Sequence, residues 1–105
     1  MQTKAQILER IKRSVKETAP DATLILYGSY ARGDEREDSD IDLLVLLNKE
    51  KITCDDRMQV ISPVFDIELE TGKLISLFFF PKKTWEINPR ITPFYENVTR
   101  EGIIL

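Results

Sequence analysis

The feature that most constrains this chain is a run of five apolar residues, Leu43 to Leu47, with two aspartates at its entry. The run contains no polar side chain, which predicts a strand or a helical segment buried on all sides. Asp40 and Asp42 precede it, separated only by Ile41. In a strand, residues two apart point to the same side, about 6.5 Å apart along the chain. We therefore expect both carboxylates to project together while Ile41 enters the core.

Two neighbouring carboxylates indicate a metal site. Held this close, they repel each other and raise one another's pKa unless a cation lies between them. Mg²⁺ takes oxygen ligands, and one or two carboxylates plus the phosphates of a substrate are a usual set. Asp40 and Asp42 are therefore candidate ligands for Mg²⁺. The alternative is that both are turn residues ahead of a strand, a position that Asp often takes.

A Gly-Ser pair upstream indicates a phosphate site. Gly28 and Ser29 follow a β-prone run, residues 23–27, which predicts a first strand. Glycine lets backbone N–H groups approach a ligand closely. Ser29 is a suitable N-cap for a short helix over residues 30–32, and a helix N-terminus favours anions. The alternative is a strand-to-helix turn with a satisfied cap. Neither G-x-x-x-x-G-K-[ST] nor G-x-G-x-x-G occurs in the chain.

The combined pattern resembles the DNA-polymerase-β-like nucleotidyltransferases, in particular the minimal nucleotidyltransferases of bacteria and archaea. Their motif is Gly-Ser, about ten residues, then Asp-x-Asp, which stands here as Gly28-Ser29 and Asp40-Ile41-Asp42. The surrounding segment LYGSYARGDEREDSDIDLLV resembles the first block of that family almost throughout. The ending PFYENVTREGIIL is similar to the close of many such small proteins.

The resemblance implies an α/β (α+β) fold, a small mixed sheet flanked by helices. It also implies transfer of a nucleoside monophosphate, AMP or a similar group, from a nucleoside triphosphate to an acceptor hydroxyl. By position, Asp40 and Asp42 would ligate the metal ions, and Gly28 and Ser29 would hold the β- and γ-phosphates. Arg32 would steady a phosphate, or alternatively would form an ion pair with Asp34, Glu35 or Asp38.

The family usually supplies a third carboxylate within an apolar-acid-apolar triplet of a later strand. Phe65-Asp66-Ile67 has that form if the segment is a strand. The alternative interpretation of this segment is a helix with Gly72 as its C-cap. Pro63 would kink this helix unless the helix starts near that residue. The inward face of the helix would carry Met58, Ile61, Phe65 and Leu69. We favour the helix. The next strand, residues 74–80, then contributes only Ser76, the third ligand is absent, and the chemistry is slow or lost.

The remaining elements follow from local signals. Residues 3–18 predict a first helix that places Ile7, Leu8, Ile11 and Val15 inward. Pro93 with Thr92 as its cap predicts a last helix that stops near Gly102.

Composition bounds the function. The 105 residues, 42% of them hydrophobic, predict a single domain over 1–105. One cysteine and no histidine exclude an internal disulfide and a zinc site. No apolar signal segment or membrane span is evident, so we expect a cytoplasmic protein. The net charge of -3 makes nucleic acid an improbable partner.

Residues 34–42 hold six acids and only Arg36, so the ligand should be a metal-loaded nucleotide rather than bare phosphate. The chain leaves no space for the helical acceptor domain of larger relatives. The resemblance therefore implies a separate helical partner of the HEPN type, which in several such pairs is adenylylated by the small protein, an antitoxin. We expect an oligomer or a hetero-complex. Two functions stay open: a Mg²⁺-dependent nucleotidyltransferase, or a binding subunit with weak or lost catalysis that masks a partner.

Overall fold

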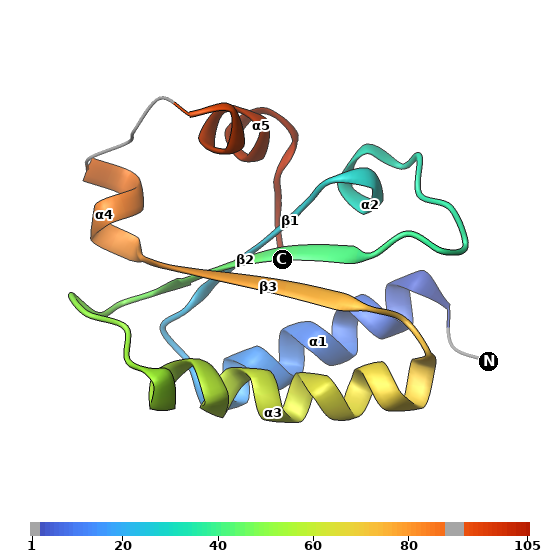
Figure 1. Cartoon of the computed structure of the whole chain (residues 1–105), viewed down its shortest axis with the longest axis horizontal. Helices are drawn as coiled ribbons and strands as arrows, with labels where there is room; N and C mark the ends of the chain where they lie inside the picture. Colours follow the sequence, from blue (N-terminus) through green and yellow to red (C-terminus); the bar gives the residue numbers. More distant parts are fainter. Residues whose placement is uncertain (1–2, 88–91) are drawn as a thin grey trace.

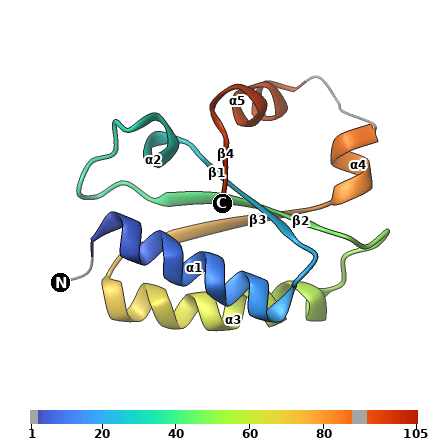
Figure 2. The same ribbon diagram turned by 180° about the vertical axis from the view of Figure 1, so that it is seen from behind.

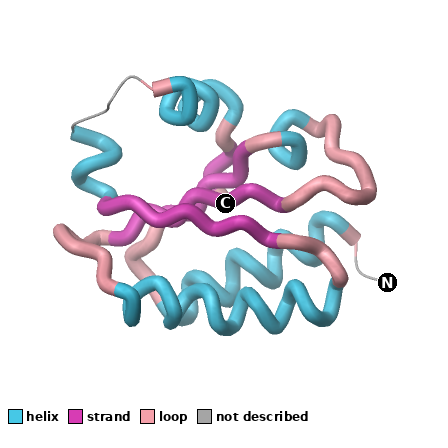
Figure 3. Tube along the Cα trace, viewed as in Figure 1, coloured by secondary structure: helices cyan, strands magenta, loops and turns pink. Residues whose placement is uncertain are grey.

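In a computed structural model, which describes residues 3–87 and 92–105, four strands form one mixed sheet and helices cover both of its faces (Figure 1; Figure 3). This arrangement confirms the expected fold class. The elements in chain order are α1 (Lys4–Thr18), β1 (Thr23–Tyr27), α2 (Ser29–Arg32), β2 (Ile41–Leu47), α3 (Cys54–Thr71), β3 (Ile75–Pro81), α4 (Lys82–Ile87), α5 (Pro93–Glu101) and β4 (Ile103–Ile104).

The strands lie in the order β3-β2-β1-β4. β1 is antiparallel to β2, with Tyr27 opposite Asp42, and β4 is antiparallel to the other edge of β1. β3 is parallel to β2, with Ser76 beside Asp42. A parallel neighbour requires a crossover connection, and α3 provides it.

β2 is the centre of the structure. The apolar run that was open to two interpretations is a strand, and all of its residues from Leu43 to Leu47 are buried. Leu43, Val45 and Leu47 pack into a core with α1 and α3. Leu44 and Leu46 point the other way and pack with Val98 of α5 and with aromatic side chains. Burial on both faces explains why the run has no polar position.

The first and last helices form where the sequence predicts them. Thr3 accepts a hydrogen bond from the N–H of Gln6 and so begins α1. Ile7, Ile11 and Val15 are buried and Leu8 is partly buried, as expected. Thr92 accepts from the N–H of Tyr95, and Pro93 occupies the first turn of α5.

α3 is a helix, as favoured, but the expected inner face is wrong. The buried residues are Val60, Val64 and Ile67, which lie at spacings of four and three. The face predicted to point inward is largely exposed, with Met58, Phe65 and Leu69 in solvent and Ile61 at its margin. The helix also passes through Pro63 rather than starting near it, because a Thr53 capping box begins it at Cys54.

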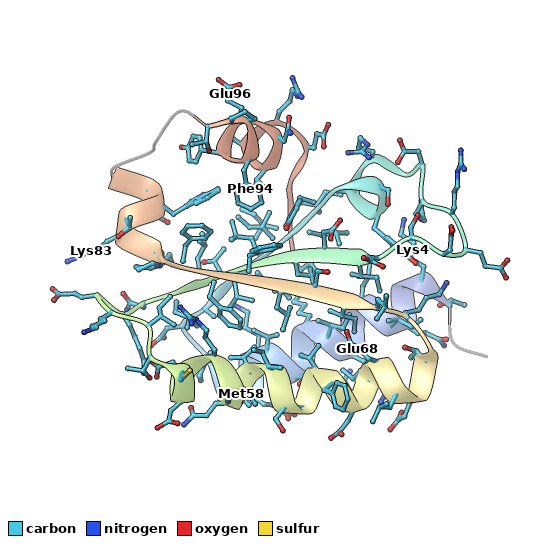
Figure 4. All side chains as sticks on the ribbon, in the orientation of Figure 1. Lys4, Met58, Glu68, Lys83, Phe94 and Glu96 are labelled. Carbon is cyan, nitrogen blue, oxygen red and sulfur yellow. The ribbon has the colours of Figure 1, made fainter. Side chains whose placement is uncertain are left out.

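α1 and α3 lie together against one face of the sheet, which Figure 2 shows from behind. α4 and α5 cover the other face, where Phe94 points from α5 toward the sheet (Figure 4). The Phe94 ring contacts Tyr27 and Trp85 at centroid distances of 5.4 and 6.0 Å. In the described part of the chain, no helix has the length and apolar character needed to cross a membrane.

Candidate functional site

Gly28 connects β1 to α2 and lies directly against the carboxylate of Asp42. Its backbone has φ +75° and ψ -155°, a region that is essentially restricted to glycine. A Cβ placed on Gly28 would lie 2.6 Å from Oδ2 of Asp42, which is far inside contact distance. Glycine is therefore required here both for the turn and for the space that the carboxylate occupies.

Asp42 lies in a row of side chains at one end of the sheet. It is the second residue of β2, between the buried Ile41 and Leu43, and it is half-buried. Tyr27 and Ser76 are its neighbours on β1 and β3. Laterally paired residues point to the same face of a sheet, so all three side chains face the side covered by α5. Asp40 comes just before the strand and is exposed.

This row is electrostatically strained when it carries no counter-ion. Burial raises the pKa of the Asp42 carboxyl, and the nearby charge of Asp40 raises it further, while Arg32 acts in the opposite direction. Burial, together with the charge of Asp42, raises the pKa of Tyr27 to about 12, so its phenol keeps its proton. A cation beside the carboxylates of Asp40 and Asp42 would lower the pKa of both Asp42 and Tyr27.

Ser29 does not have the capping role expected from the sequence. α2 begins at Ser29 itself, so the N-cap is Gly28, and α2 has no side-chain capping bond. The N–H groups of Ala31 and Arg32 bond back to the carbonyl of Gly28 at 3.1 Å. The first N–H groups of a helix have no intrahelical acceptor. The Ser29 hydroxyl therefore makes no capping bond in α2, which directly follows the glycine that lies against the Asp42 carboxylate.

The Arg32 guanidinium is held by two carboxylates. It bonds Asp34 at 3.2 Å, one of the three partners considered from the sequence, and Glu101 at the end of α5 at 3.0 Å. These bonds raise the pKa of Arg32, which is already always charged. Exposed ion pairs contribute little, so the guanidinium can exchange partners at small cost.

The acidic loop between α2 and β2 is anchored by residues that sequence reasoning missed. Lys4 of α1 donates to the backbone carbonyl of Tyr30 at 3.2 Å and pairs with Glu35 at 2.5 Å. Lys73 donates to the backbone carbonyl of Glu37 at 2.8 Å. Both lysines are far from the loop in sequence, so no local pattern could have assigned them this role. Figure 4 shows Lys4 at the end of α1 nearest the loop.

With this geometry in place, the relatives can be compared. A family model described as a nucleotidyltransferase domain matches residues 8–98. The chain belongs to this family. The resemblance noted from the Gly-Ser and Asp-x-Asp motif is confirmed, and so is the expectation of a nucleotidyltransferase.

Individual relatives agree with the family. Over 100 residues the chain is 33% identical to a "putative protein adenylyltransferase" of Methanocaldococcus jannaschii, covering 93% of this chain and 94% of that protein. A solved "putative minimal nucleotidyltransferase" superposes with a TM-score of 0.63 at 28% identity, over 96% of this chain and 94% of the other. A solved "toxin-antitoxin with AMP-PNP" superposes with a TM-score of 0.64, over 91% of this chain and 69% of the other. At 18% sequence identity this likeness shows the fold alone.

The third carboxylate that the resemblance implies is not beside Asp42 on β3. Asp66 lies exposed on α3, against the face of the sheet opposite to the one that Asp42 faces, so it cannot join the pair. The neighbour of Asp42 on β3 is Ser76. Among the described residues, no group of three or more His, Cys, Asp or Glu side chains could hold a metal ion. The site thus offers two carboxylates as candidate ligands, a set that Mg²⁺ accepts when substrate phosphates complete it.

We predict that Gly28→Ala disrupts the site more than Gly33→Ala. Both glycines have positive φ, but a Cβ on Gly33 would meet nothing within 4 Å. Gly33→Ala should therefore cost only the left-handed backbone penalty, about 1–2 kcal/mol, whereas Gly28→Ala must also displace the Asp42 carboxylate. Thermal melting and metal-dependent nucleotide binding would be measured for both variants. Retained binding in folded Gly28→Ala would contradict the importance of this contact.

We also predict that Asp42→Asn makes the metal-free protein more stable. Because folding raises the pKa of this carboxyl, the folded state holds the proton more tightly than the unfolded state. Stability therefore falls as the pH rises through the folded pKa and stays reduced at neutral pH. The neutral amide removes that cost, so the variant should melt higher than the wild type without divalent cation.

Addition of Mg²⁺ and ATP should reverse the order, since only the wild type keeps both carboxylates. Asp38→Asn removes an exposed acid of the same loop and serves as the control. Nucleotide binding by calorimetry that is equal in wild type and Asp42→Asn would reject Asp42 as a metal ligand.

Proposed function

We propose that this chain transfers a nucleoside monophosphate, AMP in the first instance, from a nucleoside triphosphate to a hydroxyl group of a partner protein in the cytoplasm. The observation that carries the proposal is the contact between Gly28 and Asp42. It unites, within one site, a turn suited to phosphate and a carboxylate suited to a metal. Membership of the nucleotidyltransferase family supports the same chemistry.

In this proposal Asp40 and Asp42 hold Mg²⁺, and the Ser29 hydroxyl with the first N–H groups of α2 holds the β- and γ-phosphates. Bound Mg²⁺ would supply positive charge to the phosphate oxygens during an in-line displacement. The acceptor hydroxyl gives up its proton to solvent water as its oxygen forms a bond to the α-phosphorus, the bond from that phosphorus to the bridging oxygen breaks, and pyrophosphate leaves. Arg32 exchanges Asp34 or Glu101 for a phosphate oxygen, which the weakness of exposed ion pairs permits.

The acidic loop sets the form of the ligand. The six acids of residues 34–42 would repel a bare triphosphate, so the nucleotide enters with its metal. The same acids disfavour nucleic acid as an acceptor. The proposed acceptor is a helical protein of the HEPN type. The name of a similar protein, a protein adenylyltransferase, supports a protein acceptor.

A second function is favoured by a specific observation, the serine beside Asp42. With Ser76 in place of a third acid, the acceptor hydroxyl has no carboxylate on β3 to take its proton, and the metal is held less tightly. The chain would then bind nucleotide and mask its partner without appreciable turnover. Incubation with each labelled nucleoside triphosphate, Mg²⁺ and the product of the adjacent gene, read by mass spectrometry, separates the two functions. Transfer supports the enzyme, and partner binding without transfer supports the binding subunit.

Ser29→Ala should weaken nucleotide affinity without lowering the melting temperature. One charge-assisted hydrogen bond to phosphate is lost, about 1–2 kcal/mol or roughly 5- to 30-fold in affinity. Because the hydroxyl makes no capping bond, the stability of the ligand-free protein should not change. Ser29→Gly should bind as weakly as Ser29→Ala. Full affinity in either variant would reject the phosphate role.

Ser76→Asp should increase metal affinity and transfer. Neighbouring strands lie about 4.8 Å apart, so a carboxylate at this position reaches a cation held by Asp42. We expect a gain of about tenfold or more in transfer rate, equivalent to about 1.4 kcal/mol of barrier. Ser76→Asn, of equal size but without charge, is the control. An unchanged rate and unchanged Mg²⁺ affinity in Ser76→Asp would show that a third carboxylate is not what limits the site.

A further inference from the structure

The outer edge of β3 is open beyond Ile75, whose N–H donates to the Glu68 carboxylate at 2.6 Å. β3 is the end strand of the sheet, and in Figure 1 its free edge faces the viewer with no other element drawn across it. Its seven residues, Ile75–Pro81, include no charged side chain. Proteins normally blunt such an edge with charge, a bulge or a very short strand. β4, at the opposite edge, is protected by being very short, because it has only two residues.

An apolar surface continues from this edge onto α3. Phe65 and Leu69 are 51% and 69% exposed, and Leu74 at the start of β3 is 64% exposed. Between α3 and β3 runs a groove of about 190 Å³, lined by Ile61, Val64, Phe65, Glu68, Ile75 and Leu77. The docking face is defined here as the β3 edge, this groove and the exposed stripe of α3, which consists of Met58, Ile61, Phe65 and Leu69.

Opposite charges lie at the two ends of the docking face. Lys82 and Lys83 follow the end of β3. The acidic loop adjoins its start, where Lys73 donates to the backbone carbonyl of Glu37 at 2.8 Å; the acids of the loop outnumber this lysine and Arg36. Figure 4 shows Lys83 at the end of the sheet opposite to Lys4, which pairs with Glu35 of the loop. The face is therefore basic at one end and acidic at the other.

We propose that a second copy of this chain docks on this face, with the two β3 strands paired antiparallel about a two-fold axis near Phe78. Antiparallel pairing places the start of one strand beside the end of the other. Lys82 and Lys83 of the second copy then lie against the acidic loop of the first copy. At the other end of the interface, the same two lysines of the first copy lie against the acidic loop of the second. A two-fold interface must be self-complementary in this way.

The stripe on α3 is self-complementary about the same axis. The axis is perpendicular to the sheet, so it also brings the two α3 helices side by side and antiparallel. Met58 then lies opposite Leu69 of the second copy, and Ile61 lies opposite Phe65 of the second copy. Apolar side chains that are exposed in one copy are thereby covered in pairs, which is the interaction that most stabilises a dimer.

A second copy fits this face better than a helical partner does. A helix can cover the apolar stripe, but its own backbone groups are already bonded, so it cannot pair with the free N–H and C=O groups of β3. A strand of matching length satisfies them and extends the sheet of each copy. Pro81 lacks an N–H, which confines pairing to the preceding residues and centres it on the middle of the strand.

Light scattering on the purified chain over a wide range of concentrations tests the proposal, and the expected mass is that of a dimer. The double variant Met58→Lys/Leu69→Lys places like charges opposite each other across the axis and should weaken the dimer about 100-fold or more. Both side chains are mostly exposed, so the variant should keep the fold, as circular dichroism would verify. Ile104→Lys changes an equally exposed apolar residue at the opposite edge and should leave the dimer intact.

A monomeric wild type at all concentrations would overturn the proposal, and so would a dimer lost in Ile104→Lys but kept in the double variant. The orientation has its own test. Opposite residues of an antiparallel strand pair lie about 4.5–5.5 Å apart, within disulfide range. Single cysteines would be introduced at 77, 78 and 79 in a protein that carries Cys54→Ser. At least one of these variants should oxidise to a covalent dimer, whereas Ile104→Cys in the same background should not. A wild-type dimer that none of the three can cross-link would contradict pairing through β3. Neither result depends on whether the protein transfers nucleotide.

Discussion

The position of every candidate site residue depends on the burial of β2. Leu43 to Leu47 are between 0% and 4% exposed, held by strands on two sides and by helices on both faces. Each such side chain stabilises the fold by about 1.5–3 kcal/mol relative to exposure. A strand fixed this firmly leaves the residue at its entry little freedom. Asp42 therefore meets Gly28 and the start of α2 in one defined geometry, without a dedicated network of hydrogen bonds to orient it.

The same burial makes the site unfavourable by itself. Asp42 is partly removed from water next to Asp40, and both effects raise its pKa. The backbone of Gly28 occupies a conformation open only to glycine, which makes room for the carboxylate. Such local costs persist when the surrounding structure fixes them, and they gather at functional sites. A cation with its phosphates would relieve the repulsion, so the stable core sustains a site that is completed only by its ligand.

Local signals in the sequence predicted most of the fold. Apolar spacing placed α1, Thr92 with Pro93 placed α5, and a β-prone run placed β1, because each depends on near neighbours in the chain. The buried run of β2 was located but stayed open between a strand and a helix. The motif also predicted that Gly28 and Asp42 belong together. Contacts between distant segments escaped: Arg32 meets Glu101, which is 69 positions away, and Lys4 meets Glu35, 31 positions away. The capping role expected for Ser29 was wrong for a smaller reason, since the helix begins one residue earlier than expected and moves the cap to Gly28.

The error on α3 has a different origin and tells more about the molecule. Two apolar stripes run along this helix, one through Val60, Val64 and Ile67 and the other through Met58, Ile61, Phe65 and Leu69. Spacing alone cannot rank them, because both follow the helical period. The crossover from β2 to β3 decides the choice by presenting the first stripe to the sheet. The second stripe has the same apolar pattern but is mostly exposed in the part of the chain that the structure describes. A helix that is apolar on a face its own domain leaves exposed has a sequence suited to two neighbours, and only one of them is the sheet of this chain.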